Sequence, residues 1–220
     1  MISSLRGLIV SCQAPVGSPL REPVVIAALA EAACLSGAVG VRIESPEHVR
    51  AVRGRIDKPI VGLWKRDYAG FEVYITPTFA DAEAIAEAGA DIIAIDGTAR
   101  ARPNGEMLPE LIRRIHVELQ KPVLADIATL AEAEAAVAAG ADIVVTTLCG
   151  YTAETKGAPL PAFDLLGTMV QNLDLPVWCE GGVSSPEQYA QALRLGAKVV
   201  VVGTALTGLE VQVRRYLNAL

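Results

Sequence analysis

Eight short apolar runs, rich in β-branched residues, alternate along the chain with alanine-rich stretches of helical character. Each run is apolar over nearly its whole length, which is typical of parallel strands buried on both faces. The eight runs are Leu8–Cys12, Ala38–Ile43, Pro59–Leu63, Asp91–Ile95, Pro122–Ala125, Asp142–Thr146, Pro176–Cys179 and Lys198–Val202. Strands joined by helical crossovers form either a closed barrel or an open sheet covered on both faces by helices.

Two of the intervening stretches show both ends of a helix. Thr78–Gly89 and Thr129–Gly140 each begin at a threonine suited to an N-cap and end at a glycine suited to the position after the C-cap. A faint internal repeat supports this reading. Residues 87–93, 138–144 and 194–200 share a glycine, a small residue and a polar residue that lead into an apolar run. The repeat indicates one helix-to-strand joint used three times.

The number of strands favours a closed barrel. The main alternative, an open doubly wound sheet, usually carries a glycine-rich nucleotide fingerprint after its first strand, and residues 11–17 contain no GxGxxG. We therefore predict a parallel eight-stranded (β/α)8 TIM barrel forming a single domain over residues 1–220. A ninth candidate strand, Val73–Thr76, is interpreted as a short excursion in a long loop, because no helix fits between residues 65 and 73.

Composition excludes several classes of protein. A net charge of −6 argues against a nucleic-acid partner, which requires a basic stripe. No apolar stretch has the length of a signal peptide core or a membrane span, and the four cysteines lack CxxC spacing, so we expect a cytoplasmic protein with reduced thiols and no membrane partner. The histidines, His48 and His116, cannot assemble a transition-metal cluster, and no serine has a visible histidine partner. We expect neither a metal nor a cofactor.

Two charged residues stand where buried strands should end. Lys65 closes the run that begins at Pro59, and Glu180 closes the run that begins at Pro176. Lysine and glutamate rarely end buried runs unless they are paired or used. The carboxyl ends of the strands build the active site of a parallel barrel, so both charges should meet over its mouth. The pair is therefore predicted to be an acid/base pair.

Other polar residues end the remaining strands: Gln13, Arg42, Asp96, Asp126, Thr146, Thr147 and Thr204. A set of acids and bases at one apolar mouth favours a site that polarises a substrate and moves a proton. Structural roles are also compatible with three of them. Asp96 with Gly97 forms a turn sequence, Asp126 precedes the helix that starts near Thr129, and Arg42 lies close to Glu44.

The last two strand ends carry glycines. Glu180 is followed by Gly181 and Gly182, and the eighth run is followed by Gly203 and Thr204. Glycine lets the backbone approach an anion closely, and helix N-termini offer free N–H groups. The loops after strands seven and eight commonly hold a phosphate in these barrels. These four residues are predicted to bind the phosphate of a ligand.

Eight segments together resemble the N-acylmannosamine-6-phosphate 2-epimerases, a family of metal-independent sugar-phosphate epimerases of sialic-acid catabolism. The resemblance runs from about residue 5 to residue 206. Its most specific parts are Lys65-Arg66, the Asp-Gly-Thr-Ala-Arg-x-Arg-Pro loop and the Thr-Thr-Leu-x-Gly-Tyr run. The segments are Ser11–Ala14, Gly40–Ile43, Pro59–Arg66, Tyr74–Thr78, Ile95–Pro103, Ala125–Ile127, Thr146–Tyr151 and Glu180–Gly182.

The resemblance assigns roles to the residues at the strand ends. It implies that Lys65 is the catalytic acid/base and Glu180 its partner, while Gln13, Arg42 and Asp126 contact the substrate. It also implies that the glycine-rich final loops hold the phosphate.

One departure from the family pattern lies after the last strand. Thr207-Gly208-Leu209 stands where Thr-Arg-Pro is expected, so the family's arginine is absent. Arg214 and Arg215 follow one or two helical turns later. An arginine–phosphate contact is often bidentate and charge-assisted, so its loss should weaken phosphate binding unless another group substitutes.

The expected reaction interconverts N-acetyl-D-mannosamine 6-phosphate and N-acetyl-D-glucosamine 6-phosphate by proton transfer at C2. Removing the proton beside an aldehyde requires a base and stabilisation of the enolate, and a partly dry site should lower the pKa of Lys65. The alternatives are a pentose-phosphate epimerase, a lysine Schiff-base synthase and a catalytically silent sugar-phosphate sensor. The partner is in each case a small sugar phosphate. A homodimer is compatible with the sequence, which does not set the oligomeric state.

Overall fold

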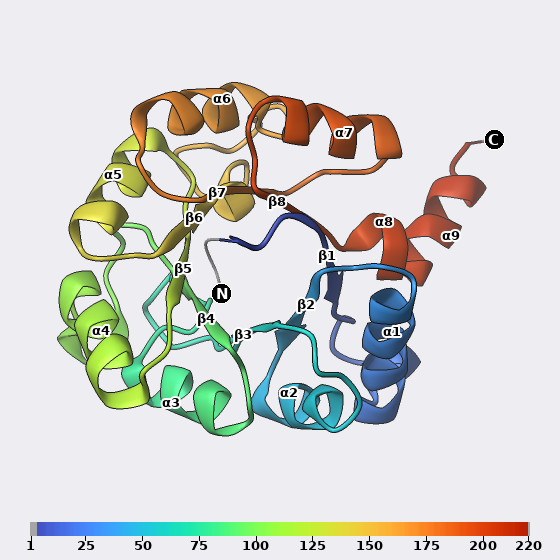
Figure 1. The fold of residues 1–220 in the computed structure, drawn as a ribbon, viewed down its shortest axis with the longest axis horizontal. Helices are drawn as coiled ribbons and strands as arrows, with labels where there is room; N and C mark the ends of the chain where they lie inside the picture. The colour runs from blue at the N-terminus through green and yellow to red at the C-terminus, as the bar shows by residue number, and fades with distance from the viewer. Residues whose placement is uncertain (1–3, 220) are drawn as a thin grey trace.

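The computed structural model describes residues 4–219. Eight parallel strands form a closed barrel in sequence order, with β1 hydrogen-bonded to both β2 and β8 (Figure 1). The closure confirms the (β/α)8 barrel and excludes the open sheet. The strands are β1 (Gly7–Cys12), β2 (Gly40–Glu44), β3 (Ile60–Leu63), β4 (Ile92–Asp96), β5 (Val123–Asp126), β6 (Ile143–Val145), β7 (Val177–Glu180) and β8 (Val199–Val202).

Helices surround the barrel, and the last of them, at the C-terminus, projects away from it (Figure 1). The α-helices are α1 (Pro23–Leu35), α2 (Pro46–Arg53), α3 (Phe79–Glu87), α4 (Leu108–Arg114), α5 (Leu130–Ala138), α6 (Phe163–Asn172), α7 (Pro186–Arg194), α8 (Thr204–Thr207) and α9 (Leu209–Leu217). Short 3-10 segments are η2 (Pro19–Arg21), η3 (Pro103–Gly105) and η5 (Thr146–Leu148), and η4 (Ile115–Leu119) is a π-helical segment. No helix within residues 4–219 has the length and hydropathy needed to cross a bilayer.

The predicted helix boundaries are confirmed at atomic detail. Thr78 and Thr129 are N-caps, and each belongs to a capping box that satisfies free N–H groups of the first turn. Gly89 and Gly140 follow the C-caps with φ of 104° and 101°, and Gly196 repeats the arrangement with 104°. These are left-handed conformations that glycine adopts without steric cost.

The polar residue of the repeated joint also has a structural role. The Asp91 carboxylate accepts a hydrogen bond of 2.8 Å from the backbone N–H of Ile60, the first residue of β3. The Asp142 carboxylate accepts one of 2.7 Å from Val123, the first residue of β5. Each aspartate thus links the first residue of one strand to the start of the next strand: Asp91 links β3 to β4, and Asp142 links β5 to β6. Both links lie at the amino-terminal end of the barrel.

Alternation along each strand decides which side chains reach the barrel interior. On β2, Val41 and Ile43 belong to the core between barrel and helices, so Arg42 between them points inward. On β7, Trp178 lies in the interior core, and the next inward position is Glu180 at the strand end. The interior is filled with apolar side chains and is not a pore. The charged inward positions Arg42 and Glu180 lie toward the carboxyl ends of their strands, where the barrel opens.

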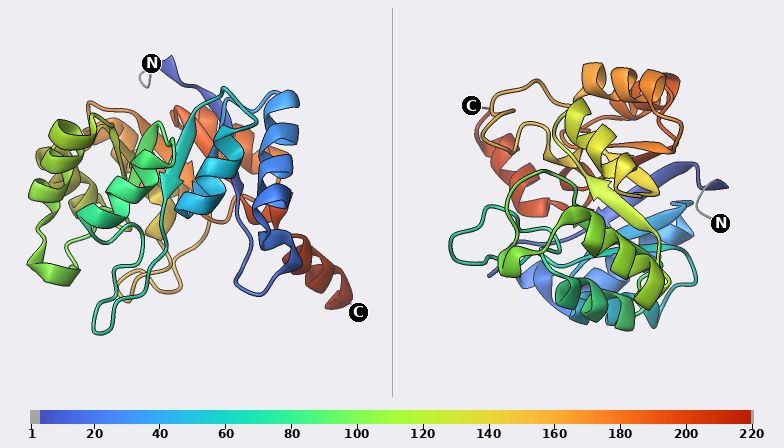
Figure 2. Two further views of the ribbon diagram at one scale, coloured as in Figure 1. Left: turned by 90° about the horizontal axis from the view of Figure 1, so that it is seen from below. Right: turned by 90° about the vertical axis from the view of Figure 1, so that its left-hand side faces the viewer.

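The loops that leave the carboxyl ends of β1, β3 and β6 project from the same end of the barrel as α9, whereas the N-terminus lies at the other end (Figure 2). In the loop after β3, Lys65 and Ile75 form an isolated antiparallel bridge. Val73–Thr76 is thus a short return within a long loop and not a ninth barrel strand, as predicted. The bridge places this return beside Lys65.

Candidate active site

A cavity of about 740 Å³ opens at the carboxyl end of the strands. Eight of the nine predicted site residues line it: Gln13, Arg42, Lys65, Glu180, Gly181, Gly182, Gly203 and Thr204. They come from the first, second, third, seventh and eighth strand ends, which only barrel closure brings to one place. The ninth, Asp126, lies behind the cavity wall.

Arg42 is the central charge of this site, with its side chain only 2% exposed. Its guanidinium donates to Glu180 Oε2 at 2.6 Å through Nη1. Through Nη2 it lies 2.8 Å from Asp126 Oδ1 and 2.9 Å from Asp126 Oδ2. Two carboxylates on two different strands thus compensate one buried cation, which holds its planar fork in a single orientation.

Asp126 contacts Arg42 and is completely buried. Burial raises the pKa of its carboxyl above the ordinary range, and the Arg42 guanidinium opposes that rise. The alternative role as a helix cap is excluded, because Thr129 caps α5. Asp126 orients Arg42 in this structure, while a direct contact between Asp126 and a ligand stays a prediction.

Glu180 is held by the end of β6. The Thr146 hydroxyl donates to the Glu180 carbonyl at 2.8 Å and accepts from its N–H at 3.1 Å. The Thr147 hydroxyl lies 3.3 Å from Glu180 Oε2, the same oxygen that Arg42 contacts. One carboxylate oxygen is therefore committed to protein donors, and the side chain remains accessible from the cavity.

Lys65 reaches the cavity from the loop just beyond β3 and makes no hydrogen bond or ion pair through its amine with residues 4–219. Its side chain is solvent-accessible, although it stands within a recess of the protein. Partial burial lowers the pKa of Lys65 below the usual lysine range, and the Arg42 guanidinium lowers it further. Both causes favour a neutral amine, which is the form that accepts a proton.

The proposed pairing of Arg42 with Glu44 is not observed. Glu44 instead accepts a hydrogen bond of 2.7 Å from Arg21, in the loop after β1, and both residues line the cavity. Gln13, two residues beyond the buried Ser11, donates to its hydroxyl at 2.9 Å. The loop after β1 therefore forms one wall of the site.

The glycines of the seventh loop are required by its conformation. Gly181 and Gly182 have φ of 106° and 72°. A Cβ added to Gly182 would stand 2.5 Å from the Cβ of Leu160, so no larger residue fits there without movement. Gly203 and Thr204 line the cavity where α8 begins. Exposed backbone on this side of the cavity suits an anion more than a bulky side chain.

Four further residues line the cavity: Tyr74, Glu210, Arg214 and Arg215. Sequence reasoning did not single out Tyr74 or Glu210, and it noted the two arginines only as following the position of the absent one. Burial raises the pKa of Tyr74, and its phenol makes no hydrogen bond within the described part of the chain. The position of Tyr74 in the return that pairs with the Lys65 segment is the signal that could have found it. The other three lie on α9, whose course away from the barrel the sequence pattern did not indicate.

Asp96 does not line the cavity. It is fully buried and accepts hydrogen bonds from the N–H and hydroxyl of Thr98 and from Arg100, so it has the turn role that we considered. His48 is buried against Ser45 and the carbonyls of Glu44 and Arg21. No group of histidines, cysteines and acids suited to a metal ion occurs among residues 4–219.

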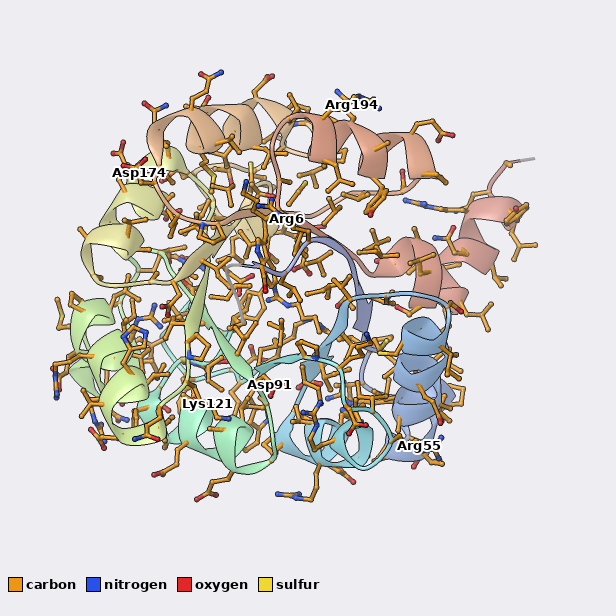
Figure 3. The ribbon with its side chains drawn as sticks, in the orientation of Figure 1. Arg6, Arg55, Asp91, Lys121, Asp174 and Arg194 are labelled. Atoms are coloured by element: carbon orange, nitrogen blue, oxygen red, sulfur yellow. The ribbon has the colours of Figure 1, made fainter. Side chains whose placement is uncertain are left out.

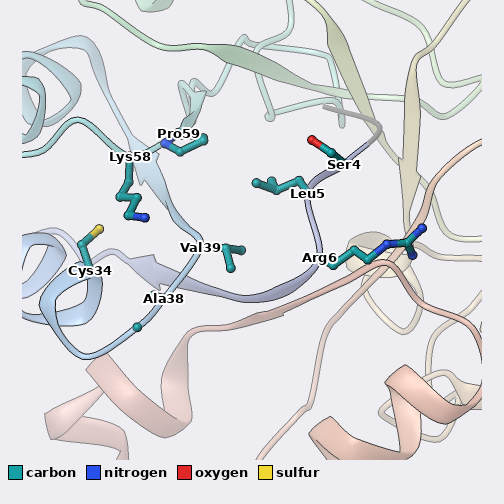
Figure 4. Close-up of a pocket in the computed structure, with 9 residues that line it drawn as sticks. Ser4, Leu5, Arg6, Cys34, Ala38, Val39, Lys58 and Pro59 are labelled. Atoms are coloured by element: carbon teal, nitrogen blue, oxygen red, sulfur yellow. The ribbon is translucent and has the colours of Figure 1, made fainter. Parts of the chain in front are cut away.

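The opposite end of the barrel has a different character. Figure 3 labels Arg55, Asp91, Lys121 and Asp174, each of which lies between a helix and the strand that follows it, together with Arg6 before β1 and Arg194 at the end of α7. A smaller cavity of about 330 Å³ lies at this end, and Figure 4 shows residues that line it, Arg6 and Lys58 among them. No predicted site residue lines it, in agreement with a structural role for the amino-terminal end of such barrels.

A family model described as "Putative N-acetylmannosamine-6-phosphate epimerase" matches residues 26–220. This chain belongs to that epimerase family. A relative from Thermosynechococcus vestitus, named "Putative N-acetylmannosamine-6-phosphate 2-epimerase", is 58% identical over 214 residues, which cover 97% of this chain and 93% of that protein. A relative of the same name from Synechococcus elongatus is 56% identical over 216 residues, with the same coverage.

Solved structures agree with the family and the fold. The N-acetylmannosamine-6-phosphate 2-epimerase from Clostridium perfringens superimposes with a TM-score of 0.96 at 36% identity, covering all of this chain (100%) and 96% of that chain. The thiamine phosphate pyrophosphorylase from Pyrococcus furiosus has a TM-score of 0.62 at 15% identity, and that likeness shows the barrel alone.

Proposed function

We propose that this epimerase interconverts N-acetyl-D-mannosamine 6-phosphate and N-acetyl-D-glucosamine 6-phosphate in amino-sugar catabolism. The observation that carries the proposal is the convergence of Lys65, Glu180 and Arg42 on one cavity at the barrel mouth. A carbon acid beside an aldehyde requires a base, an acid and a fixed positive charge within one site. The two proteins compared above at more than half identity bear the name of this activity.

The proton transfers belong to Lys65 and Glu180. In one direction the neutral amine of Lys65 takes the proton from C2, and the C–H electron pair forms the C1–C2 double bond while the aldehyde oxygen becomes an enolate. Protonated Glu180 returns a proton to the other face of C2, which restores the aldehyde and inverts the configuration. Each forward turnover leaves Lys65 protonated and Glu180 deprotonated. The reverse reaction, in which the two groups exchange roles, or proton exchange with solvent restores the starting protonation.

The remaining predicted residues bind the sugar. Arg42 presents a cation whose orientation is fixed by Asp126, and it stabilises negative charge that develops on the substrate. Gln13 contacts the hydroxyl or amide groups. Gly181, Gly182, Gly203 and Thr204 hold the phosphate with backbone N–H groups.

The test is proton NMR of N-acetylmannosamine 6-phosphate with the purified protein. We expect the gluco epimer to appear, and Lys65→Met to slow its appearance by roughly a thousandfold or more with an unchanged circular dichroism spectrum. Lys58→Met, at the opposite end of the barrel, is the matched control and should keep the wild-type rate. Binding of the sugar phosphate without any epimer would contradict the proposal and indicate a sensor. Borohydride trapping of substrate on Lys65 would indicate a Schiff-base enzyme instead.

A homodimer is part of the proposal. Leu209, Val213, Tyr216 and Leu217 form an exposed apolar stripe on α9, with exposed fractions of 58%, 47%, 82% and 66%. Because α9 projects from the barrel (Figure 1), its own chain does not cover this stripe, and the same stripe of a second copy is a self-complementary partner. Light scattering should give a dimer that Val213→Glu dissociates; a wild-type monomer would contradict this.

A cytoplasmic location is also proposed. The four cysteines are unpaired, as is usual in a reducing compartment. Burial raises the pKa of Cys12 to about 12 and that of Cys179 to about 11, so these thiols are inert side chains of the core and not nucleophiles.

A further inference from the structure

Position 208 has no room for the arginine that the family resemblance places there. A Cβ added to Gly208 would stand 2.8 Å from the carbonyl oxygen of Thr204 and 3.0 Å from its Cα. Both of those atoms belong to the backbone of α8, so a side-chain rotation cannot relieve the contact. In this arrangement of α8 and α9, any guanidinium that contacts the phosphate of the ligand must come from a position other than 208.

Helix α9 brings two arginines to the same cavity. It starts directly after Gly208, and the Gln212 side-chain amide donates to the carbonyl oxygen of Thr204 at 2.8 Å, which anchors the first turn of α9 beside the predicted phosphate loop. Arg214 and Arg215, in the following turn, line the cavity together with Thr204. The cavity therefore has a cationic wall next to its glycine-rich wall.

The direction in which helical side chains point brings the guanidinium groups of Arg214 and Arg215 closer to the predicted phosphate loop. Arg214 and Arg215 lie roughly 10 Å along the helix axis from Gly208, given the rise of an α-helix. Side chains on an α-helix lean toward its N-terminus, so both arginines lean back toward Gly208 and Thr204. An extended arginine side chain spans most of the remaining distance.

Of the four arginines that line the cavity in the described part of the chain, two are paired with carboxylates and two are not. Arg42 is bound by two carboxylates, and Arg21 is bound by Glu44. Within residues 4–219, Arg214 and Arg215 make no side-chain hydrogen bond or ion pair, although they line a cavity in a protein of net charge −6. Cations left free beside exposed backbone N–H groups are suited to a phosphate dianion.

One acid stands near them. Glu210 precedes Arg214 by one turn and lines the cavity, but the Ser18 hydroxyl donates to its carboxylate and holds it against the loop after β1. Arg214 offsets this negative charge from the next turn, which leaves Arg215 as the stronger cation toward a ligand.

We propose that Arg214 and Arg215 bind the phosphate of the substrate and replace the arginine that is absent at position 208. The inference rests on the proposed function, since that function supplies the phosphorylated ligand. The two guanidinium groups act from α9, while Gly182 and Thr204 act from the other side through their backbone. Both arginines are binding residues, and neither takes part in the proton transfer.

The test uses Arg214→Gln, Arg215→Gln and the double variant, with Arg194→Gln as the control. Arg194 lies at the end of α7 (Figure 3) and does not line the cavity. The Arg194→Gln variant therefore removes the same charge at a position away from the site. We expect the double variant to raise KM for the sugar phosphate by at least about tenfold and to change kcat less than about threefold, while Arg194→Gln changes neither. Arg215→Lys should recover part of the loss. Wild-type KM in the double variant would overturn the inference.

Calorimetric titration with inorganic phosphate separates this inference from the proposed function, because it requires no turnover. We expect the wild-type protein to bind inorganic phosphate and the double variant to bind it at least about tenfold more weakly. Weakened phosphate binding in a protein that proved unable to epimerise would support the inference while the function failed. Normal epimerisation with unaltered phosphate binding in the double variant would leave the function standing and reject the inference.

Discussion

Lys65 is paired through its backbone with Ile75, in an isolated antiparallel bridge beyond the end of β3. Flanking hydrogen bonds run from Arg66 N–H to the Tyr74 carbonyl at 2.9 Å and from Thr76 N–H to the Trp64 carbonyl at 2.8 Å. The proposed catalytic lysine is therefore positioned by a loop that returns to it, and not by the barrel strand that precedes it.

Thr76 should control the position of Lys65. Its buried hydroxyl accepts from Trp64 N–H at 3.0 Å and donates to the Ala94 carbonyl at 2.7 Å, which joins the return to β4. Thr76→Val loses both bonds, so we expect a destabilisation of about 1–3 kcal/mol in urea unfolding. We also expect kcat to fall at least about tenfold with a smaller change in KM. Thr76→Ser keeps the hydroxyl and should retain most of the activity; a wild-type kcat in the valine variant would refute the positioning role.

Removing the Arg42 guanidinium should leave two carboxylates without their cation. For Arg42→Met we expect a loss of about 3–5 kcal/mol in unfolding free energy at neutral pH, because the completely buried Asp126 must either stay charged without a partner or take up a proton. Arg42 lowers the pKa of Asp126, so in its absence that pKa rises further and the carboxyl becomes neutral more readily on acidification. The loss measured by urea unfolding should therefore be smaller at low pH. Adding Asp126→Asn to Arg42→Met should restore part of the stability, and equal losses in the single and double variants would count against the pairing.

The pH dependence of kcat/KM should report Lys65. Its pKa is lowered by burial and by Arg42, and the base is the deprotonated form. Because the step requires a neutral Lys65 and a protonated Glu180 together, activity should pass through a maximum and fall on both sides of it, with the alkaline limb below the ordinary lysine pKa of about 10.4. An NMR titration of 13C-labelled lysine should show one resonance with the same lowered pKa, which Lys65→Met removes. A Lys65 resonance that titrates at or above the ordinary value would contradict the assignment of the base.

Two glycines should respond oppositely to alanine. A Cβ at Gly62 on β3 would stand 2.5 Å from Ile85 Cγ2 and 2.6 Å from the Cβ of Ala90, so Gly62→Ala should destabilise by about 1–3 kcal/mol through overpacking. Gly167 in α6 has nothing within 4 Å of such a Cβ, so Gly167→Ala should stabilise by about 0.5–1 kcal/mol. Thermal unfolding of both variants measures the difference. A stabilised Gly62→Ala variant would contradict the tight packing of β3 against α3.

The barrel and most of the site could be predicted because they depend on local rules. Apolar runs and capping residues mark the strands and helices, and the charges that close two of these runs, Lys65 and Glu180, mark the carboxyl ends of the strands. The same rules could not predict that Arg42 pairs with Asp126 and Glu180, since that contact joins β2, β5 and β7 and exists only when the barrel closes. Sequence proximity instead suggested Glu44.

The course of α9 is the second feature beyond the reach of the sequence. The sequence analysis assigned no position to this helix, which leaves the barrel (Figure 2) and brings Arg214 and Arg215 to the cavity. The turn at Gly208, between α8 and α9, decides this direction. Such a choice between two packings depends on contacts of the folded barrel and not on periodicity.

Solvent deuterium tests the central claim most directly. Turnover of N-acetylmannosamine 6-phosphate in deuterium oxide should place deuterium at C2 of the gluco product, because Lys65 and Glu180 exchange their protons with solvent between turnovers. Proton NMR should show the loss of the C2 signal and the collapse of its coupling to H1, in step with epimer formation and abolished by Lys65→Met. A gluco product that keeps its original C2 proton through many turnovers, or epimerisation that continues unchanged without Lys65, would contradict the account.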